Sequence, residues 1–110
     1  MNKKIEFEYQ GVNYTLEYNR DAIRYMEGEG LNIDEVQSKP LTMIEILWKG
    51  AFFKNHRTEK VNKIEEIYKC IPNKTELHNA LSQMFYEAYA VLIGDAEEVD
   101  DSKNINWKMS

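Results

Sequence analysis

The side chains best suited to covalent or acid–base chemistry are few: two histidines, His56 and His78, and one cysteine, Cys70. A nucleophilic serine or cysteine needs a histidine base within hydrogen-bond reach and a third group that orients the base. His56 is expected at a helix end beside Arg57, and His78 on the polar side of another helix. We therefore expect both histidines to be solvated surface residues, and Cys70 to be a small packed residue with an inert thiol.

Metal and phosphate sites are also poorly represented in the sequence. The carboxylates of residues 95–101 could supply oxygen ligands to a calcium ion, but this stretch lacks the central glycine and closing glutamate of an EF-hand loop. Runs of like charge more often form solvated segments. Gly28 and Gly30 do not extend to a GxGxxG phosphate-binding pattern, and Gly50 is expected inside a helix. The sequence thus predicts no catalytic, cofactor or metal site, and a protein that is not an enzyme.

Length and charge restrict the class of protein further. A chain of 110 residues predicts one domain with one modest core. The net charge of −5 disfavours nucleic acid as a partner, because phosphate binding needs a surplus of lysine and arginine. A single cysteine excludes an intramolecular disulfide and fits a reducing cytosol. The first residues lack the apolar region of a secretion signal, and no apolar stretch reaches membrane-spanning length, so we expect a soluble protein without a membrane partner.

The elements that position these residues are organised around one apolar stretch, residues 41–56, LTMIEILWKGAFFKNH. At helical spacing its apolar stripe consists of Leu41, Ile44, Leu47, Trp48, Ala51 and Phe52, widened by Met43, Ile46 and Phe53. Because apolar residues cover most of its circumference, we expect this helix at the centre of the domain. Pro40 is expected in its first turn, where a missing N–H costs nothing.

Residues 4–18 alternate between apolar and polar side chains, the pattern of a β-hairpin with one buried and one solvated face. The apolar set is Ile5, Phe7, Tyr9, Val12, Tyr14, Leu16 and Tyr18. Gly11 can supply the positive φ angle that a tight turn needs. Because two strands alone are marginal in water, the hairpin must lie on the helices or pair its edge with another chain.

Three further helices are predicted, at residues 20–29, 59–70 and 74–93. Asn19 is expected to cap the first and Thr58 the second. Asn73, with Glu76 three residues later, has the capping-box spacing for the third. The connector at residues 31–39 has room for one helical turn, at residues 33–37.

The predicted fold class is therefore α+β, with an N-terminal β-hairpin packed on a mainly helical domain of about four helices. Residues 1–94 are expected to form a single globular domain. Residues 95–110 are acidic and poor in apolar side chains, which predicts a flexible tail.

Two features indicate protein binding. The second half of the 74–93 helix carries Tyr86, Tyr89, Ala90 and Ile93 opposite its core stripe. This arrangement is typical either of a fully internal helix end or of a docking face for another chain. Trp107 follows the acidic stretch, and either folds back on its own domain or anchors to a partner. Tyr86, Tyr89, Ile93 and Trp107 are therefore the candidate partner-binding residues.

The order of these segments resembles a known family. The stretches that carry the likeness are GVNYTLEY, NRDAIRYMEGEGLNIDEV, KPLTMIEILWKGAFFKNH and an acidic tail with NWKMS. Over most of its length the chain resembles the tail assembly chaperones of long-tailed phages and prophages of Gram-positive bacteria. The resemblance implies a non-enzymatic protein that binds the tape measure protein in the host bacterial cytoplasm, keeps it soluble and helps tail tube subunits polymerise around it. It implies no catalytic residue, and it implies a gene that is often read with a programmed frameshift to give a longer second product.

The physical requirements of that role agree with the sequence. Weak apolar contacts repeated along one long partner would gain strength by avidity, so we expect protein binding, with self-association and the tail tube protein as further possibilities. An alternative is a small phage regulatory or DNA-binding adaptor, in which the helices near Thr58 and Asn73 imitate a helix-turn-helix; the acidic balance disfavours it. A small enzyme would instead need a polar pocket with converging ionisable groups.

Overall fold

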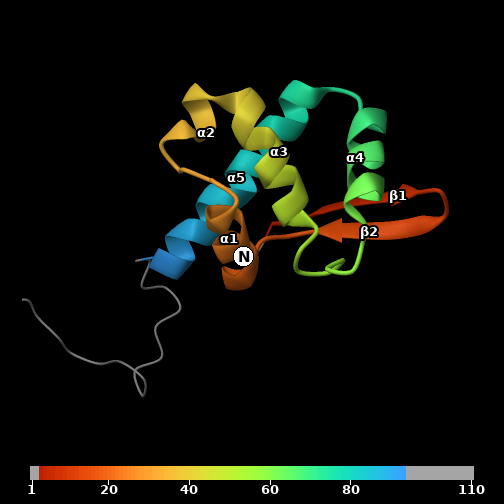
Figure 1. The fold of residues 1–110 in the computed structure, drawn as a ribbon, viewed down its shortest axis with the longest axis horizontal. Coiled ribbons are helices and arrows are strands. Elements are labelled where there is room, and N and C mark those ends of the chain that lie inside the picture. Colours follow the sequence, from red (N-terminus) through yellow and green to blue (C-terminus); the bar gives the residue numbers. More distant parts are fainter. Residues whose placement is uncertain (1–2, 94–110) are drawn as a thin grey trace, which may run out of the picture.

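The computed structural model describes residues 3–93 and begins with a β-hairpin (Figure 1). Strands β1 (Ile5–Tyr9) and β2 (Val12–Leu16) pair antiparallel, in a register that sets the apolar residues of one strand opposite those of the other. Gln10 and Gly11 join them with φ angles of 51° and 80°. Positive φ at both positions is the signature of a type I′ turn, whose twist matches that of the strands. The predicted hairpin and the predicted role of Gly11 are confirmed.

Five helices follow the hairpin: α1 (Arg20–Gly28), α2 (Glu35–Ser38), α3 (Pro40–Ala51), α4 (Val61–Cys70) and α5 (Lys74–Ile93). Helix α3 contacts each of the other four helices, and in Figure 1 it runs through the middle of them. The predicted α+β fold and the central position of this helix are confirmed. No helix among residues 3–93 is both long and apolar enough to cross a membrane.

Trp48 of α3 lies where the hairpin, α3 and α4 meet. Its ring centroid is 6.2 Å from that of Phe7, 5.0 Å from that of Phe52 and 5.7 Å from that of Tyr68. The indole Nε1–H donates to the carbonyl of Ile64 at 2.9 Å, so the polar atom of this buried side chain has a partner. These contacts fix the hairpin and α4 on the same part of α3.

The first residue of the predicted apolar stripe, Leu41, does not belong to the core. Its side chain is 85% exposed, whereas Met43, Ile44 and Leu47 are buried. Leu41 lies in the first turn of α3, where it borders a surface groove instead of facing another helix. Helical periodicity alone does not show where the neighbouring elements end, and this is why the prediction was wrong at Leu41.

Helix α3 also ends earlier than predicted, at Ala51 instead of residue 56. The N–H groups of Phe52 and Phe53 bond to carbonyls three residues earlier, which tightens the chain into turns. The Ala51 carbonyl accepts a hydrogen bond from the N–H of Glu17, at 3.2 Å. The N–H of Glu17, just after β2, therefore bonds to a carbonyl that would accept from residue 55 if the helix continued.

The predicted start of the 59–70 helix is likewise shifted. Helix α4 begins at Val61 after Lys60, which makes no side-chain cap, and Thr58 lies in a turn of the preceding loop. The carboxylate of Glu59 accepts a hydrogen bond from the Tyr14 hydroxyl at 2.6 Å. Glu59 therefore belongs to the loop that contacts the hairpin, and not to the helix. The prediction that Thr58 caps the helix is wrong.

The other helix boundaries are close to those predicted. Asn19 caps α1, because its Oδ1 accepts from the N–H of Ala22 at 2.8 Å. Helix α2 is the single turn expected in the connector, but it begins two residues later and ends one residue later than predicted. Asn73, before α5, has a φ of 55°. An N-cap is extended, so the capping box predicted for Asn73 is wrong although the bounds of α5 are as expected.

Candidate protein-binding surface

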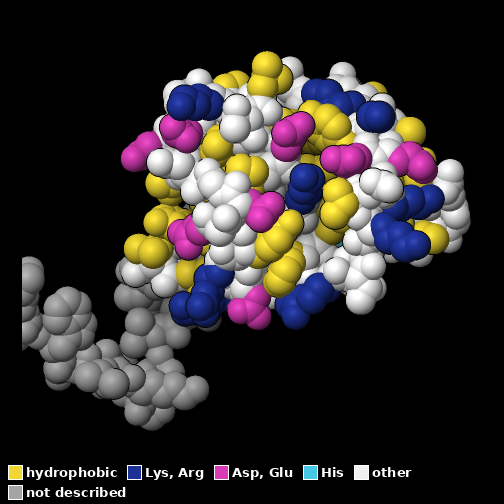
Figure 2. All heavy atoms as spheres, viewed as in Figure 1, with side chains coloured by type: hydrophobic (Ala, Val, Ile, Leu, Met, Phe, Trp, Pro, Cys, Tyr) yellow, Lys and Arg dark blue, Asp and Glu magenta, His cyan; other side chains and the backbone are white. Residues whose placement is uncertain are grey.

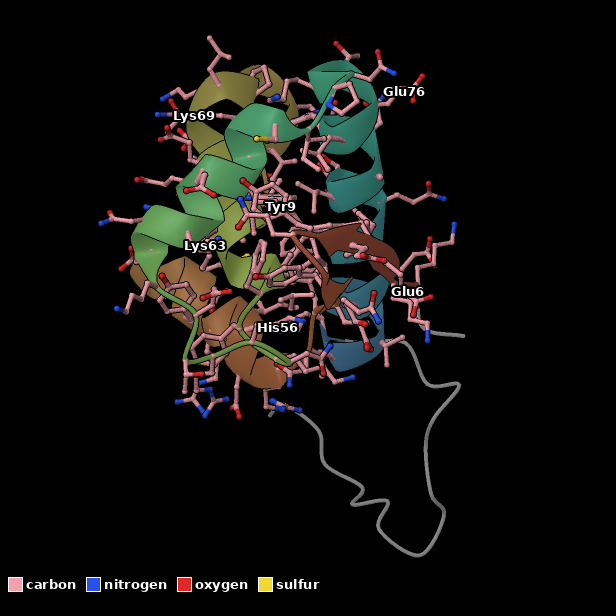
Figure 3. The ribbon with its side chains drawn as sticks, turned by 90° about the vertical axis from the view of Figure 1, so that its right-hand side faces the viewer. Glu6, Tyr9, His56, Lys63, Lys69 and Glu76 are labelled. Carbon is pink, nitrogen blue, oxygen red and sulfur yellow. The ribbon has the colours of Figure 1, made fainter. Side chains whose placement is uncertain are left out.

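The outer edge of β2 is covered by the loop between α3 and α4. The N–H of Thr15 donates to Nε2 of His56 at 3.0 Å, and the amide of Asn55 donates to the Thr15 carbonyl at 3.1 Å. The ring of His56 lies 5.0 Å from that of Tyr14 and is half-buried. The expectation that His56 is a solvated residue is wrong, because the ring serves as a structural acceptor for the strand (Figure 3).

Ionisable groups also join the end of the hairpin to the loop between α3 and α4. Lys54 Nζ lies 2.7 Å from a carboxylate oxygen of Glu17, and Asn55 donates to the other oxygen at 3.2 Å. The hydrogen bond from Lys54 is the main reason that the pKa of Glu17 lies below its usual value. The bond from Tyr14 to Glu59, aided by burial, raises the pKa of Tyr14 to about 12.

The tip of the hairpin is fixed to α4 in a similar way. The Tyr9 hydroxyl donates to Glu66 at 2.5 Å, and Lys63 Nζ donates to the side chain of Gln10 at 2.6 Å (Figure 3). The bond between Tyr9 and Glu66 raises the pKa of Tyr9 and, together with the Lys63 charge, lowers the pKa of Glu66. Cys70 is exposed with its Sγ 3.8 Å from the Tyr9 hydroxyl, so the expectation of a packed cysteine is wrong.

The second histidine also has a structural contact. His78 is half-buried on α5, and its Nε2 lies 3.2 Å from the carbonyl oxygen of Val36 in α2. A carbonyl can only accept, so Nε2–H is the donor, and the expectation of a solvated His78 is wrong. Within residues 3–93 no group of three or more histidine, cysteine, aspartate or glutamate side chains is placed to hold a metal ion.

The outer edge of β1 differs from that of β2. In a hairpin closed by a two-residue turn, the odd-numbered residues of β1 bond to β2, so the backbone groups of Glu6 and Glu8 point outward. Thr15 is the equivalent outward residue of β2, and it is bonded to the loop. Among residues 3–93, no group bonds to the outward N–H and C=O of Glu6 or Glu8. Strand β1 therefore presents an unpaired edge, the usual template for an added strand.

The C-terminal half of α5 lies next to the start of β1. Lys3 Nζ is 3.1 Å from a carboxylate oxygen of Glu87, which joins the two elements. Four and six residues further along the helix, Val91 is 42% exposed and Ile93 is 67% exposed. The start of β1 thus lies beside the middle of the C-terminal half of α5, whereas the exposed end of α5 and the tip of the hairpin extend to opposite sides (Figure 1).

The predicted partner-binding residues differ in their accessibility. Ile93 is exposed, whereas Tyr86 and Tyr89 are half-buried, with ring centroids 5.6 Å and 5.5 Å from that of the buried Phe85. Both tyrosines pack partly on the core and partly face outward. This position lies between the two alternatives that the sequence left open, a fully internal helix end and a docking face. Trp107 lies outside the described residues.

A groove between α3 and α4 was not anticipated from the sequence. It has a volume of about 380 Å³ and is lined by Glu45, Trp48, Lys49, Glu65, Tyr68 and Lys69. A second groove of about 390 Å³ shares Tyr68 and includes Leu41. Figure 2 shows this side of the molecule, where apolar, acidic and basic side chains lie next to one another. Neither groove had a signal in the sequence, because the space between helices follows from their packing.

A family model described as a domain of unknown function, DUF5055, matches residues 1–110. No curated protein and no solved structure matches the chain significantly. Because the family model covers the whole chain, this protein belongs to the DUF5055 family.

Proposed function

We propose that this protein is a non-enzymatic tail assembly chaperone of a long-tailed phage or prophage, acting in the host bacterial cytoplasm. Its main partner would be the tape measure protein, a long helical polypeptide with apolar faces that need cover before the tail tube encloses them. The observation that carries this proposal is the apolar end of α5, where Val91 and Ile93 are exposed beside half-exposed Tyr86 and Tyr89. Exposed apolar and tyrosine-rich patches are typical of protein-binding sites.

The other surface features support the same kind of partner. The groove between α3 and α4 offers the half-buried Tyr68 ring between acidic and basic side chains, which suits one face of an amphipathic helix. The net charge of −5 favours the solubility of the chaperone and of its complexes. Many copies along one tape measure protein would gain by avidity, and self-association or contact with the tail tube protein would add to it.

A co-expression experiment tests this proposal. The tape measure protein from the same genome is expressed with and without this chain, and its soluble fraction is measured. We expect this chain to raise that fraction, and the double variant V91S/I93S to lose most of the effect because the apolar contact area is removed. A tape measure protein that stays equally insoluble with and without the chain would refute the proposal.

The chain offers a matched control for this experiment. Val61 of α4 is 51% exposed, similar to Val91, but it lies on a different helix. The variant V61S should solubilise the tape measure protein as well as the unchanged chain does. Both variants should keep their thermal midpoint within a few degrees, because exposed side chains contribute little to stability.

A further inference from the structure

The unpaired edge of β1 has a candidate occupant within the same chain. We propose that residues 105–109, with the sequence Ile-Asn-Trp-Lys-Met, add to the outer edge of β1 as a third strand. The hairpin would then become a three-stranded sheet, with the loop between α3 and α4 closing one edge and this segment closing the other. Three strands with an apolar face are also more stable than two.

The first argument is the pattern of the segment. Ile105, Trp107 and Met109 alternate with Asn106 and Lys108. In a strand the three apolar residues share one face and the two polar residues share the other. The three apolar side chains can therefore extend the row of half-buried apolar residues on the inner face of β1, while the polar pair extends the solvated face.

The second argument is charge. The solvated face of β1 carries Glu6 and Glu8, both exposed. Lys108 would stand directly beside Glu8 if the added strand runs parallel to β1, or beside Glu6 if it runs antiparallel. Opposite charges on neighbouring strands stabilise a sheet, and like charges destabilise it. A second copy of β1 would instead bring further glutamates to this edge, which favours the segment at 105–109 as the occupant.

The third argument is reach. Helix α5 ends at Ile93, six residues beyond Glu87, whose carboxylate pairs with Lys3 at the start of β1. Six helical residues span about 9 Å. The connection at residues 94–104 has eleven residues, which extend to about 36 Å. Since a five-residue strand is about 17 Å long, the segment can reach β1 in either direction.

The fourth argument concerns the edge itself. An exposed strand edge invites unwanted pairing, and natural sheets protect it with short strands, charged side chains, proline, a bulge or a covering element. Strand β1 is five residues long and carries Glu6 and Glu8, but it has no proline, and its register with β2 is regular from Ile5 to Tyr9. Of these protections, a covering segment is the one that would also pair the backbone groups of Glu6 and Glu8.

Amide hydrogen exchange, measured residue by residue by NMR on the full chain, tests the proposal. We expect the N–H groups of Glu6 and Glu8 to exchange roughly tenfold more slowly in the unchanged chain than in the variant I105D/W107D. The N–H of Phe7, which bonds to β2, should be unaffected and shows that the hairpin remains folded. The control S102D/N104D adds the same charge outside the alternating segment and should leave Glu6 and Glu8 protected.

Other outcomes would overturn the proposal. Equal exchange of Glu6 and Glu8 in the unchanged chain and in I105D/W107D would show that residues 105–109 do not cover the edge. Protection that appears only as the protein concentration is raised would assign the edge to a second copy of the chain. Protection that is lost to the same extent in S102D/N104D would show a general effect of charge, with no strand formed.

Discussion

His56 shows how one side chain joins two elements. It accepts a hydrogen bond from the N–H of Thr15 and places its ring against Tyr14. We predict that His56→Ala lowers the free energy of unfolding by about 1–3 kcal/mol, because a backbone donor loses its partner. His56→Phe should recover part of this loss, since it keeps the ring contact without the acceptor. Urea titrations followed by circular dichroism measure both changes, and an unchanged midpoint in His56→Ala would contradict the assignment.

The contact of Glu17 with Lys54, which joins the hairpin to the loop after α3, makes the stability of the protein depend on pH. Its pKa is lowered in the folded protein, chiefly by Lys54, so its stabilising effect is present above the unfolded value near 4.5. That effect is lost as the pH falls through the lower, folded pKa. We predict that Glu17→Gln costs about 1 kcal/mol at pH 7. The difference from the unchanged protein should shrink towards zero as the pH falls below 4.5.

Thermal unfolding between pH 3 and pH 7 measures this difference. Glu27 provides the matched control, because it is an exposed glutamate of α1. Glu27→Gln should leave stability nearly unchanged over the whole range. If Glu17→Gln and Glu27→Gln followed the same curve, the contact between Glu17 and Lys54 would not stabilise the fold.

At the scale of elements, the crossing of α1 and α3 depends on one glycine. Gly50 lies where a Cβ would overlap Sδ and Cγ of Met26, a fully buried side chain of α1. We predict that Gly50→Ala destabilises the protein by about 1–3 kcal/mol, because the two helices must separate. Gly28→Ala is the matched control, since a Cβ there meets nothing within 4 Å. That change should be neutral or slightly stabilising.

A double variant tests whether Met26 is the cause. Met26→Ala alone should cost about 2–5 kcal/mol by opening a cavity. In Gly50→Ala with Met26→Ala the new methyl group fills part of that cavity, so the combined loss should be smaller than the sum of the two single losses. Additive losses, measured by chemical denaturation, would show that the overlap with Met26 is not what makes Gly50 necessary.

Local sequence patterns predicted which helices and strands form better than they predicted the residues at which these begin and end. Alternation gave the hairpin, and Asn19 marked the start of α1, because both signals act between residues close in the chain. The early end of α3 and the late start of α4 were missed, since both depend on contacts with the hairpin, from Glu17 to Ala51 and from Tyr14 to Glu59. Contacts between residues more than thirty positions apart leave no periodic trace in a sequence.

At the scale of the whole molecule, the tyrosines of α5 connect stability with the proposed function. Tyr86 and Tyr89 are half-buried against Phe85. We predict that Tyr86→Ala and Tyr89→Ala weaken binding of the tape measure protein more than they weaken folding. Each should cost about 1 kcal/mol of stability, well below the 3–5 kcal/mol of a fully buried aromatic residue. Thermal unfolding and the co-expression assay measure the two effects, and a loss of several kcal/mol would assign the tyrosines to the core.

The candidate surface was only partly predictable. The sequence indicated the apolar end of α5, because residues such as Ile93 lie opposite its core stripe. It could not show that the loop around His56 covers β2 while β1 has no such cover within residues 3–93, since this depends on how the hairpin lies against the helices. The groove beside Trp48 was missed for the same reason: the space between two helices follows from their packing.

The position of Trp48 has a practical consequence. An indole that is 2% exposed, surrounded by aromatic rings and bonded to a carbonyl, should emit at short wavelength, and unfolding should shift that emission to the red. The chain has one other tryptophan, Trp107. In a Trp107→Phe background the intrinsic fluorescence would come from Trp48 alone. Stopped-flow records of that signal would then time the moment at which the hairpin and α4 separate from α3.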